Sequence, residues 1–179
     1  MTLGFVRPES ISEAVKFLSE HKDNSRIIAG ATDVMVQLRR VKPAEEKPLW
    51  LVDITSIPEL AYINLDNGIV RIGTMTTHRD IARSTVIRDI APFLADACRS
   101  VGSPQIRARG TIGGNIVNAS PAADSLPPLT ALSARLRLIG KRGSRDVAIE
   151  DFFRGPYKTV IESDEILEEV YFEVPQPSS

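Results

Sequence analysis

The sequence is poor in cysteine, in long apolar runs and in any excess of charge of one sign. Cys98 is the single cysteine in 179 residues, so a disulfide framework is impossible and a cysteine-rich metal site has too few ligands. The formal net charge is -1, with 22 basic and 23 acidic side chains interspersed, which excludes the clustered positive charge that nucleic-acid backbones require. The apolar runs fall short of the ~18 residues of a membrane-spanning helix, and Met1 opens on a mixed segment rather than a signal peptide. We expect no nucleic-acid partner, no membrane span and a cytoplasmic location.

The first part of the chain has the pattern of a small parallel βαβ lobe. A capping box at residues 10–13 and an apolar stripe predict a helix that ends near His21. Residues 26–29 and 49–52 are apolar strands, and a helix over residues 34–39 separates them. Strand, helix, strand is the order of a parallel unit. We take residues 1–55 as the first lobe.

The pattern changes after residue 55, which predicts a second, mixed lobe over residues 56–179. Asn67 and Gly68 separate two strand-like runs and favour a tight antiparallel hairpin. A helix begins near residues 76–80, and residues 90–101 carry an apolar stripe that includes Cys98, which we expect to be buried. Alternating residues between 135 and 174 predict further antiparallel strands. The fold class is therefore α+β.

Residues 102–128 follow neither a helix nor a strand pattern, and we interpret this stretch as a long functional loop. Its centre has three glycines, two asparagines and several hydroxyls between residues 110 and 121. Glycine reaches positive φ and lets backbone N–H groups approach a ligand closely, which suits a diphosphate. A plain surface turn is the alternative reading of the same composition.

Residues 29–34 form a second small-residue turn, placed between a strand and a helix. Such a turn directs free N–H groups and the positive end of a helix at one point, where a phosphate binds well. The chain contains neither a G-x-G-x-x-G fingerprint nor a G-x-x-x-x-G-K-[ST] loop, which argues against a Rossmann domain and a P-loop. Two glycine-rich turns in a two-lobed domain favour a phosphorylated ligand in a cleft between the lobes.

The two turns carry a family resemblance. The A-G-A-T-D run at residues 29–33, the T-I-G-G-N run at residues 111–115 and residues 118–124 closely resemble the FAD-binding subunit of molybdenum hydroxylases, the family of xanthine dehydrogenase and carbon monoxide dehydrogenase. The resemblance spans nearly the whole chain. It implies a two-lobed FAD-binding domain of the PCMH type, with FAD between the lobes and its diphosphate held mostly by backbone N–H groups of both loops.

The resemblance also implies roles for particular residues. Asp124 stands where the family contacts the ribityl or ribose hydroxyls of the flavin, while Lys158 and Ile166 or Leu167 approach the isoalloxazine. The expected cofactor-binding residues are Ala29, Gly30, Ala31, Thr32, Asp33, Val34, Thr77, His78, Thr111, Gly113, Gly114, Asn115, Asn118, Ser120, Asp124, Lys158, Ile166 and Leu167. No metal site is expected, because His21 and His78 are far apart and stand in no metal-ligand spacing.

The implied function is electron relay, with no catalytic residue on this chain. In the family, substrate is oxidised at a molybdenum cofactor on a large subunit, electrons cross [2Fe-2S] clusters on a small subunit, and FAD passes them to NAD or another acceptor. Three departures bear on this reading. Ala31 replaces the usual second glycine of the first loop, Thr32 and Asp33 follow the xanthine dehydrogenase side of the family, and the usual C-terminal domain is expected to be absent.

Two other functions stay open, the first because of Ala31 and the expected absence of the C-terminal domain. One is an assembly module of such a complex that has lost flavin binding, and the other is a free-standing flavoprotein oxidase. Adjacent charged pairs are not expected to be functional. The acidic side chains at residues 45–46 and 168–169 point apart in an extended chain, so we expect them in solvent. We expect the same of the basic pairs at residues 39–40 and 141–142.

Overall fold

The structure, a computed structural model, describes residues 3–38 and 48–175. Its first sheet has the strand order β1-β3-β2, from β1 (Leu3–Val6), β3 (Leu49–Asp53) and β2 (Ser25–Ile28), and both pairs are parallel. Helix α2 (Val34–Leu38) connects β2 to β3, so the predicted strand-helix-strand unit is confirmed. Strand β1 was not predicted. Two charged pairs lie outside the described residues, the basic pair at residues 39–40 and the acidic pair at residues 45–46. The predicted end of the helix at residue 39 lies outside them too.

Helix α1 (Ile11–His21) has the predicted start and end. The Ser10 side chain accepts a hydrogen bond from the Glu13 N–H, which satisfies a free donor of the first turn. The apolar stripe Ala14, Val15 and Leu18 is buried. It packs in one cluster with Val52, Ile54, Ile57, Leu60 and Ile166, so α1 shares its core with strands of both sheets. The 3₁₀ turns η1 (Lys22–Asn24) and η2 (Pro58–Leu60) flank this region. The lobe boundary at residue 55 stays a prediction.

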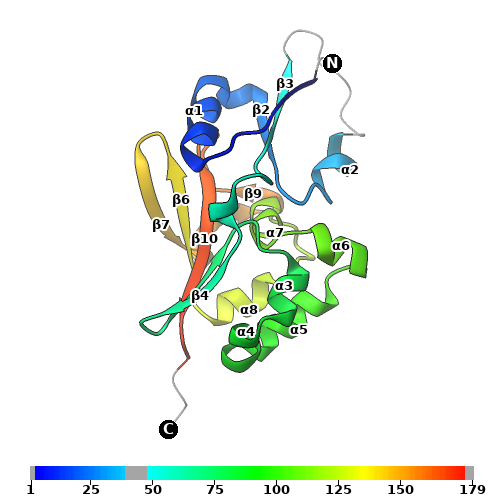
Figure 1. Ribbon diagram of the computed structural model, residues 1–179, viewed down its shortest axis with the longest axis vertical. Helices are drawn as coiled ribbons and strands as arrows, with labels where there is room; N and C mark the ends of the chain where they lie inside the picture. Colours follow the sequence, from blue (N-terminus) through cyan, green and yellow to red (C-terminus); the bar gives the residue numbers. More distant parts are fainter. Residues whose placement is uncertain (1–2, 39–47, 176–179) are drawn as a thin grey trace.

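The second sheet is antiparallel throughout, with the order β4-β5-β10-β6-β7 (Figure 1). Its strands are β4 (Ile63–Asp66), β5 (Ile69–Gly73), β10 (Ile166–Glu173), β6 (Arg135–Gly140) and β7 (Gly143–Ala148). The predicted hairpin is confirmed, since Asn67 and Gly68 have φ values of 49° and 77° between β4 and β5. Two positive φ values are the signature of the tight turn that matches strand twist.

Helices cover one face of this sheet and bury it. They are α3 (His78–Arg83), α4 (Thr85–Ile90), α5 (Pro92–Ser100), α8 (Leu126–Ala131) and α9 (Ile149–Phe152), and Figure 1 shows α3, α4, α5 and α8 gathered beside the lower half of β10. The alternate residues Val70, Ile72, Leu136, Leu138, Val170 and Phe172 point into this core. Cys98 is fully buried among them, as predicted.

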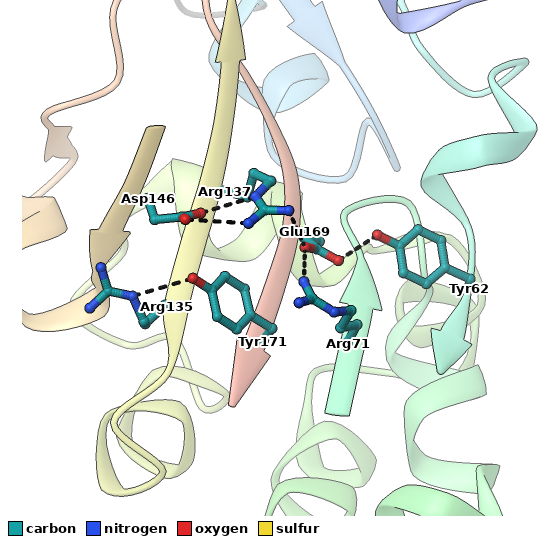
Figure 2. A network of polar contacts seen from close by, with 7 residues as sticks. All are labelled: Tyr62, Arg71, Arg135, Arg137, Asp146, Glu169 and Tyr171. Atoms are coloured by element: carbon teal, nitrogen blue, oxygen red, sulfur yellow. Dashed lines mark hydrogen bonds and ion pairs between the residues drawn. The ribbon is translucent and has the colours of Figure 1, made fainter. Parts of the chain in front are cut away.

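On the opposite face of the sheet, α1 covers Ile139 and Ile166, and the part beyond them carries a connected set of polar and charged side chains (Figure 2). Glu169 is only 3% exposed, which corrects the expectation of a solvated pair at residues 168–169. Its carboxylate accepts a hydrogen bond from the Tyr62 hydroxyl at 2.7 Å and pairs with Arg71, and Arg137 lies 3.6 Å away. The register of the strand sets this outcome, because residues on neighbouring strands supply the partners that make burial of a carboxylate tolerable. A sequence window contains none of those partners.

The expected long loop over residues 102–128 is instead three short helices. They are α6 (Pro104–Arg109), α7 (Ile112–Asn118) and the start of α8. Ser103 and Thr111 cap α6 and α7 through their side-chain oxygens, and both helices are too short to show an apolar stripe in the sequence. Gly113 and Gly114 lie inside α7 and are not among the glycines with positive φ. Across the part of the chain that is described, no helix is long and apolar enough to cross a membrane.

Candidate functional site

A cavity of about 540 Å³ opens where the loop before α2 meets α7 and the start of β10. Figure 1 shows α2 above α6 and α7, with β10 to their left. The volume falls in the range of small-molecule and cofactor sites, roughly 300–1,000 Å³. Its walls are mixed, because backbone groups, carboxylates and apolar side chains such as Ile106, Ile166 and Leu167 all line it.

The loop between β2 and α2 supplies open backbone donors. No residue in the described ranges accepts a hydrogen bond from the N–H groups of Gly30, Ala31 or Thr32. Ala31 has φ 63°, the left-handed conformation that costs an alanine about 1 kcal/mol relative to glycine. Gly30 is required for another reason, since a Cβ there would lie 2.1 Å from the Arg109 carbonyl oxygen. The loop therefore runs in direct contact with the end of α6.

The second glycine motif forms the start of α7, and its backbone donors are already used. Ile112 and Gly113 donate to the Thr76 and Thr74 carbonyl oxygens, both at 3.0 Å, and Gly114 donates to the Thr111 hydroxyl at 3.2 Å. The expected contact of this motif with a diphosphate stays a prediction. Gly113 serves close packing, because a Cβ there would lie 1.5 Å from Thr74 Oγ1. In the first loop, by contrast, the N–H groups of Gly30, Ala31 and Thr32 have no acceptor among the described residues.

The Asn115 side chain, in the middle of α7, is held by the N-cap residue of α8. Ser125, which is fully buried, donates to Asn115 Oδ1 at 2.6 Å. The Asn115 amide oxygen is thereby occupied, and its NH₂ group keeps two donors for the cavity that Asn115 lines. Asp124 and Asp33 also line the cavity and are exposed in it, so their carboxylates are acceptors for hydroxyl groups.

His78 is the most buried titratable group of the cavity wall, with 2% of the residue exposed. Burial lowers its pKa to about 4, and the carboxylates of Asp124 and Asp33 oppose that shift without cancelling it. The imidazole is therefore neutral at pH 7. Its Nδ1 atom is buried and has no hydrogen-bond partner among the residues that the structure describes.

The structure brings together nearly all the residues singled out in the sequence. Those that line the cavity are Ala29, Gly30, Ala31, Thr32, Asp33, Val34, His78, Thr111, Gly113, Gly114, Asn115, Asn118, Ser120, Asp124, Ile166 and Leu167. Thr77 and Lys158 are not part of the wall. The Thr77 side chain caps α3 by accepting from the Asp80 N–H at 3.1 Å, and Lys158 is exposed on β9 (Lys158–Thr159).

The sequence reading missed other wall residues, among them Arg26, Thr74, Val101, Ile106 and Tyr157. Tyr157 has φ 59° and follows β8 (Phe153–Gly155), and its N–H donates to the Ala119 carbonyl oxygen at 2.9 Å. Positive φ in a bulky residue is an outlier that the surrounding structure must impose. Nothing in the local sequence marks Tyr157 as part of the wall. Within the described ranges, no group of three His, Cys, Asp or Glu side chains could hold a metal ion.

Two loops from different parts of a mixed fold that close on one partly apolar cavity define a ligand-binding domain. Residues 1–177 match the family model described as the FAD binding domain in molybdopterin dehydrogenase. The chain belongs to this family, and the expected fold class, an α+β domain of the PCMH type, is confirmed.

Curated relatives and solved structures agree with this membership. The chain is 39% identical over 173 residues to the glyceraldehyde dehydrogenase medium chain of Sulfolobus acidocaldarius, covering 96% of this chain and 59% of that one. It is 36% identical over 172 residues to the xanthine dehydrogenase FAD-binding subunit of Escherichia coli, covering 96% and 57%. The structure is similar to that of CO dehydrogenase from Oligotropha carboxidovorans, with a TM-score of 0.92, 32% identity and coverage of 98% and 60%. The chain thus spans about three fifths of the length of these relatives.

Proposed function

We propose that the cavity binds FAD and that the chain is the flavin-carrying part of a molybdenum hydroxylase. The observation that carries this proposal is the composition of the cavity wall, which offers three kinds of partner in one space. Gly30, Ala31 and Thr32 have N–H groups without an acceptor among the described residues, and these suit anionic phosphate oxygens. The wall therefore fits a ligand that carries a diphosphate.

The remaining wall matches the other two parts of FAD. Asp33 and Asp124 place carboxylate oxygens in the cavity, and these accept hydrogen bonds from hydroxyls such as those of ribityl and ribose groups. Ile166 and Leu167 line the cavity at the start of β10 and belong to the two apolar clusters, so this part of the wall is apolar and suits a planar ring system. Asn115 adds two amide donors beside the first loop.

Bound FAD supplies a carrier that exchanges one or two electrons at a time. We propose that it receives electrons from [2Fe-2S] clusters on a small subunit and passes them to NAD or another acceptor. Oxidation of the substrate belongs in this proposal to a molybdenum cofactor on a large subunit. The chain's own residues bind and orient the flavin and exclude water from its ring. The cytoplasmic location stays a prediction.

The test is calorimetric titration of the chain with FAD, and then of the Asp124→Asn variant. We expect FAD to bind the wild-type chain, and the variant to bind about 3- to 10-fold more weakly, because it loses a charged acceptor for a hydroxyl. Asp96→Asn is the matched control, since the Asp96 carboxylate is 67% exposed on α5, outside the cavity wall. No binding by the folded wild-type chain contradicts the proposal.

A second function, an assembly module that has lost flavin binding, is favoured by one observation. Ala31 has a left-handed conformation in the loop whose N–H groups are the free donors. This conformation is strained for alanine, so it destabilises the loop in the form that would bind a phosphate. This alternative predicts that the chain binds no FAD yet co-purifies with iron–sulfur and molybdenum subunits. Flavin in the co-purified complex, bound to this chain, rejects it.

A further inference from the structure

His78 is the first residue of α3 and contacts the segment that enters α7. Its backbone N–H donates to the Gly110 carbonyl oxygen at 3.0 Å, and its Cδ2 atom lies 3.3 Å from the position that a Cβ on Gly110 would occupy. Thr32 Oγ1 lies 3.7 Å from the same position. The imidazole therefore stands where the first loop approaches the entry to α7, and it lines the cavity there.

The two ring nitrogens have different surroundings. Nδ1 is buried and has no hydrogen-bond partner among the described residues. Nε2 also makes no hydrogen bond to those residues, but it is not buried. Nε2 is therefore open to the cavity. A neutral imidazole carries one proton, and a buried N–H without an acceptor is disfavoured more than a buried bare acceptor. We therefore expect the proton on Nε2, where it is available to a ligand.

The charge state follows from what faces the ring. Asp124 and Asp33 are the carboxylates that act on it, and burial outweighs both, so the pKa of His78 is lowered and the ring is uncharged at pH 7. A phosphate placed directly against the ring would add further negative charge and draw a proton onto it. A hydroxyl would leave the ring neutral, and it could donate to Asp33 or Asp124 while accepting from Nε2.

We infer that His78, protonated on Nε2 only, donates a hydrogen bond to a hydroxyl of the ligand's polyol and thereby fixes that polyol between the two loops. This inference rests on the proposed function, because it concerns the same cavity. It assigns His78 as a positioning residue with a defined tautomer.

The tautomer can be measured without any ligand. The chain has two histidines, and a His21→Gln variant identifies the resonances of His78 in nitrogen-resolved NMR spectra. His21 is a suitable residue to remove because it stacks on Phe17, with ring centroids 4.1 Å apart, and is not part of the cavity wall. We expect a protonated Nε2 and an unprotonated Nδ1 at pH 7. A proton on Nδ1, or a charged ring, overturns the inference.

Binding of FAD provides the second measurement. In a His78→Gln variant the amide nitrogen reaches the place of Nε2, whereas in His78→Asn it reaches only the place of Nδ1. We expect His78→Asn and His78→Leu to bind FAD about 3- to 10-fold more weakly than the wild-type chain, and His78→Gln to recover most of the loss. Equal affinity of His78→Leu and the wild-type chain overturns the inference, as does a His78→Gln variant no better than His78→Asn.

Proton linkage completes the test and separates it from the proposed function. Titrations at pH 6 in two buffers of different ionisation enthalpy report proton uptake on binding, and we expect none that depends on His78. Uptake that disappears in His78→Gln places a phosphate at the ring and overturns the polyol assignment. If the wild-type chain binds no FAD, the proposed function fails together with this role. FAD binding that ignores His78 overturns the role alone.

Discussion

Gly113 and Gly114 are adjacent in α7, yet their replacement has different consequences. A Cβ on Gly113 would lie 1.5 Å from Thr74 Oγ1, 2.6 Å from Thr74 Cβ and 2.9 Å from the Thr74 carbonyl oxygen. Thr74 is 4% exposed and its carbonyl oxygen accepts from Gly113, so neither side has room to move. Overpacking of this kind costs about 1–3 kcal/mol, and backbone contact places Gly113→Ala at about 3 kcal/mol or more.

Gly114 meets a softer environment. A Cβ there would lie 3.0 Å from Thr111 Oγ1 and 3.8 Å from the Ala29 Cβ, both side-chain atoms. Alanine also gains up to about 1 kcal/mol of helix propensity over glycine. We expect the free energy of unfolding of Gly114→Ala to lie within about 1 kcal/mol of that of the wild-type chain. The larger Gly114→Val fills the space toward Ala29, and we expect it to abolish FAD retention while leaving a folded chain.

Urea denaturation followed by circular dichroism measures the first effect, and FAD titration of the folded variants measures the second. The reasoning predicts a stability defect for Gly113→Ala and a binding defect for Gly114→Val. Gly113→Ala as stable as the wild-type chain would refute the packing role of Gly113. Wild-type FAD content in Gly114→Val would refute the assignment of this part of the cavity to the cofactor.

Three further predictions concern strain, protonation and a buried charge. Ala31→Gly removes left-handed strain at φ 63°, so we expect the free energy of unfolding to rise by about 0.5–1 kcal/mol. An unchanged midpoint of thermal unfolding would show that Ala31 is not strained. The folded pKa of His78 is about 4 against an ordinary 6.5, so the unfolded chain takes up a proton first as pH falls. Stability should therefore drop by up to about 3 kcal/mol between pH 6.5 and 4, and urea titrations of His78→Leu should lack that component. Glu169→Gln leaves the Arg71 guanidinium without its buried carboxylate, and we expect a loss of about 2–4 kcal/mol in urea, against about 0.5 or less for the exposed Asp96→Asn.

The elements that the sequence predicted are those with strong local signals. The capping side chain of Ser10 and the stripe of α1 are local, and so is the Asn67-Gly68 turn whose two residues both adopt positive φ. Strand β1 was missed because its four residues have an alternating exposed and half-buried pattern and gain their partner only from β3. Glu169 was misread because its partners come from β5, β6 and the residue before β4.

The candidate site was predictable in its location and less so in its chemistry. Both glycine-rich segments reach the same cavity, since small residues were the visible signal in each. The packing role of Gly113 could not be predicted from the sequence, because its neighbour Thr74 is far away along the chain and no sequence pattern links the two residues. Thr77 and His78 are adjacent in the sequence, and both were predicted to contact the cofactor. In the structure the Thr77 hydroxyl caps α3, and only His78 lines the cavity.

The measurement that tests the central claim most directly is the visible absorption spectrum of the purified chain after incubation with FAD and removal of unbound cofactor. The account predicts that an oxidised flavin spectrum stays with the protein peak at about one FAD per chain. It also predicts that this spectrum is lost in Gly114→Val, whose circular dichroism remains that of the wild-type chain. A colourless, well-folded wild-type chain would contradict the claim that this cavity holds the cofactor.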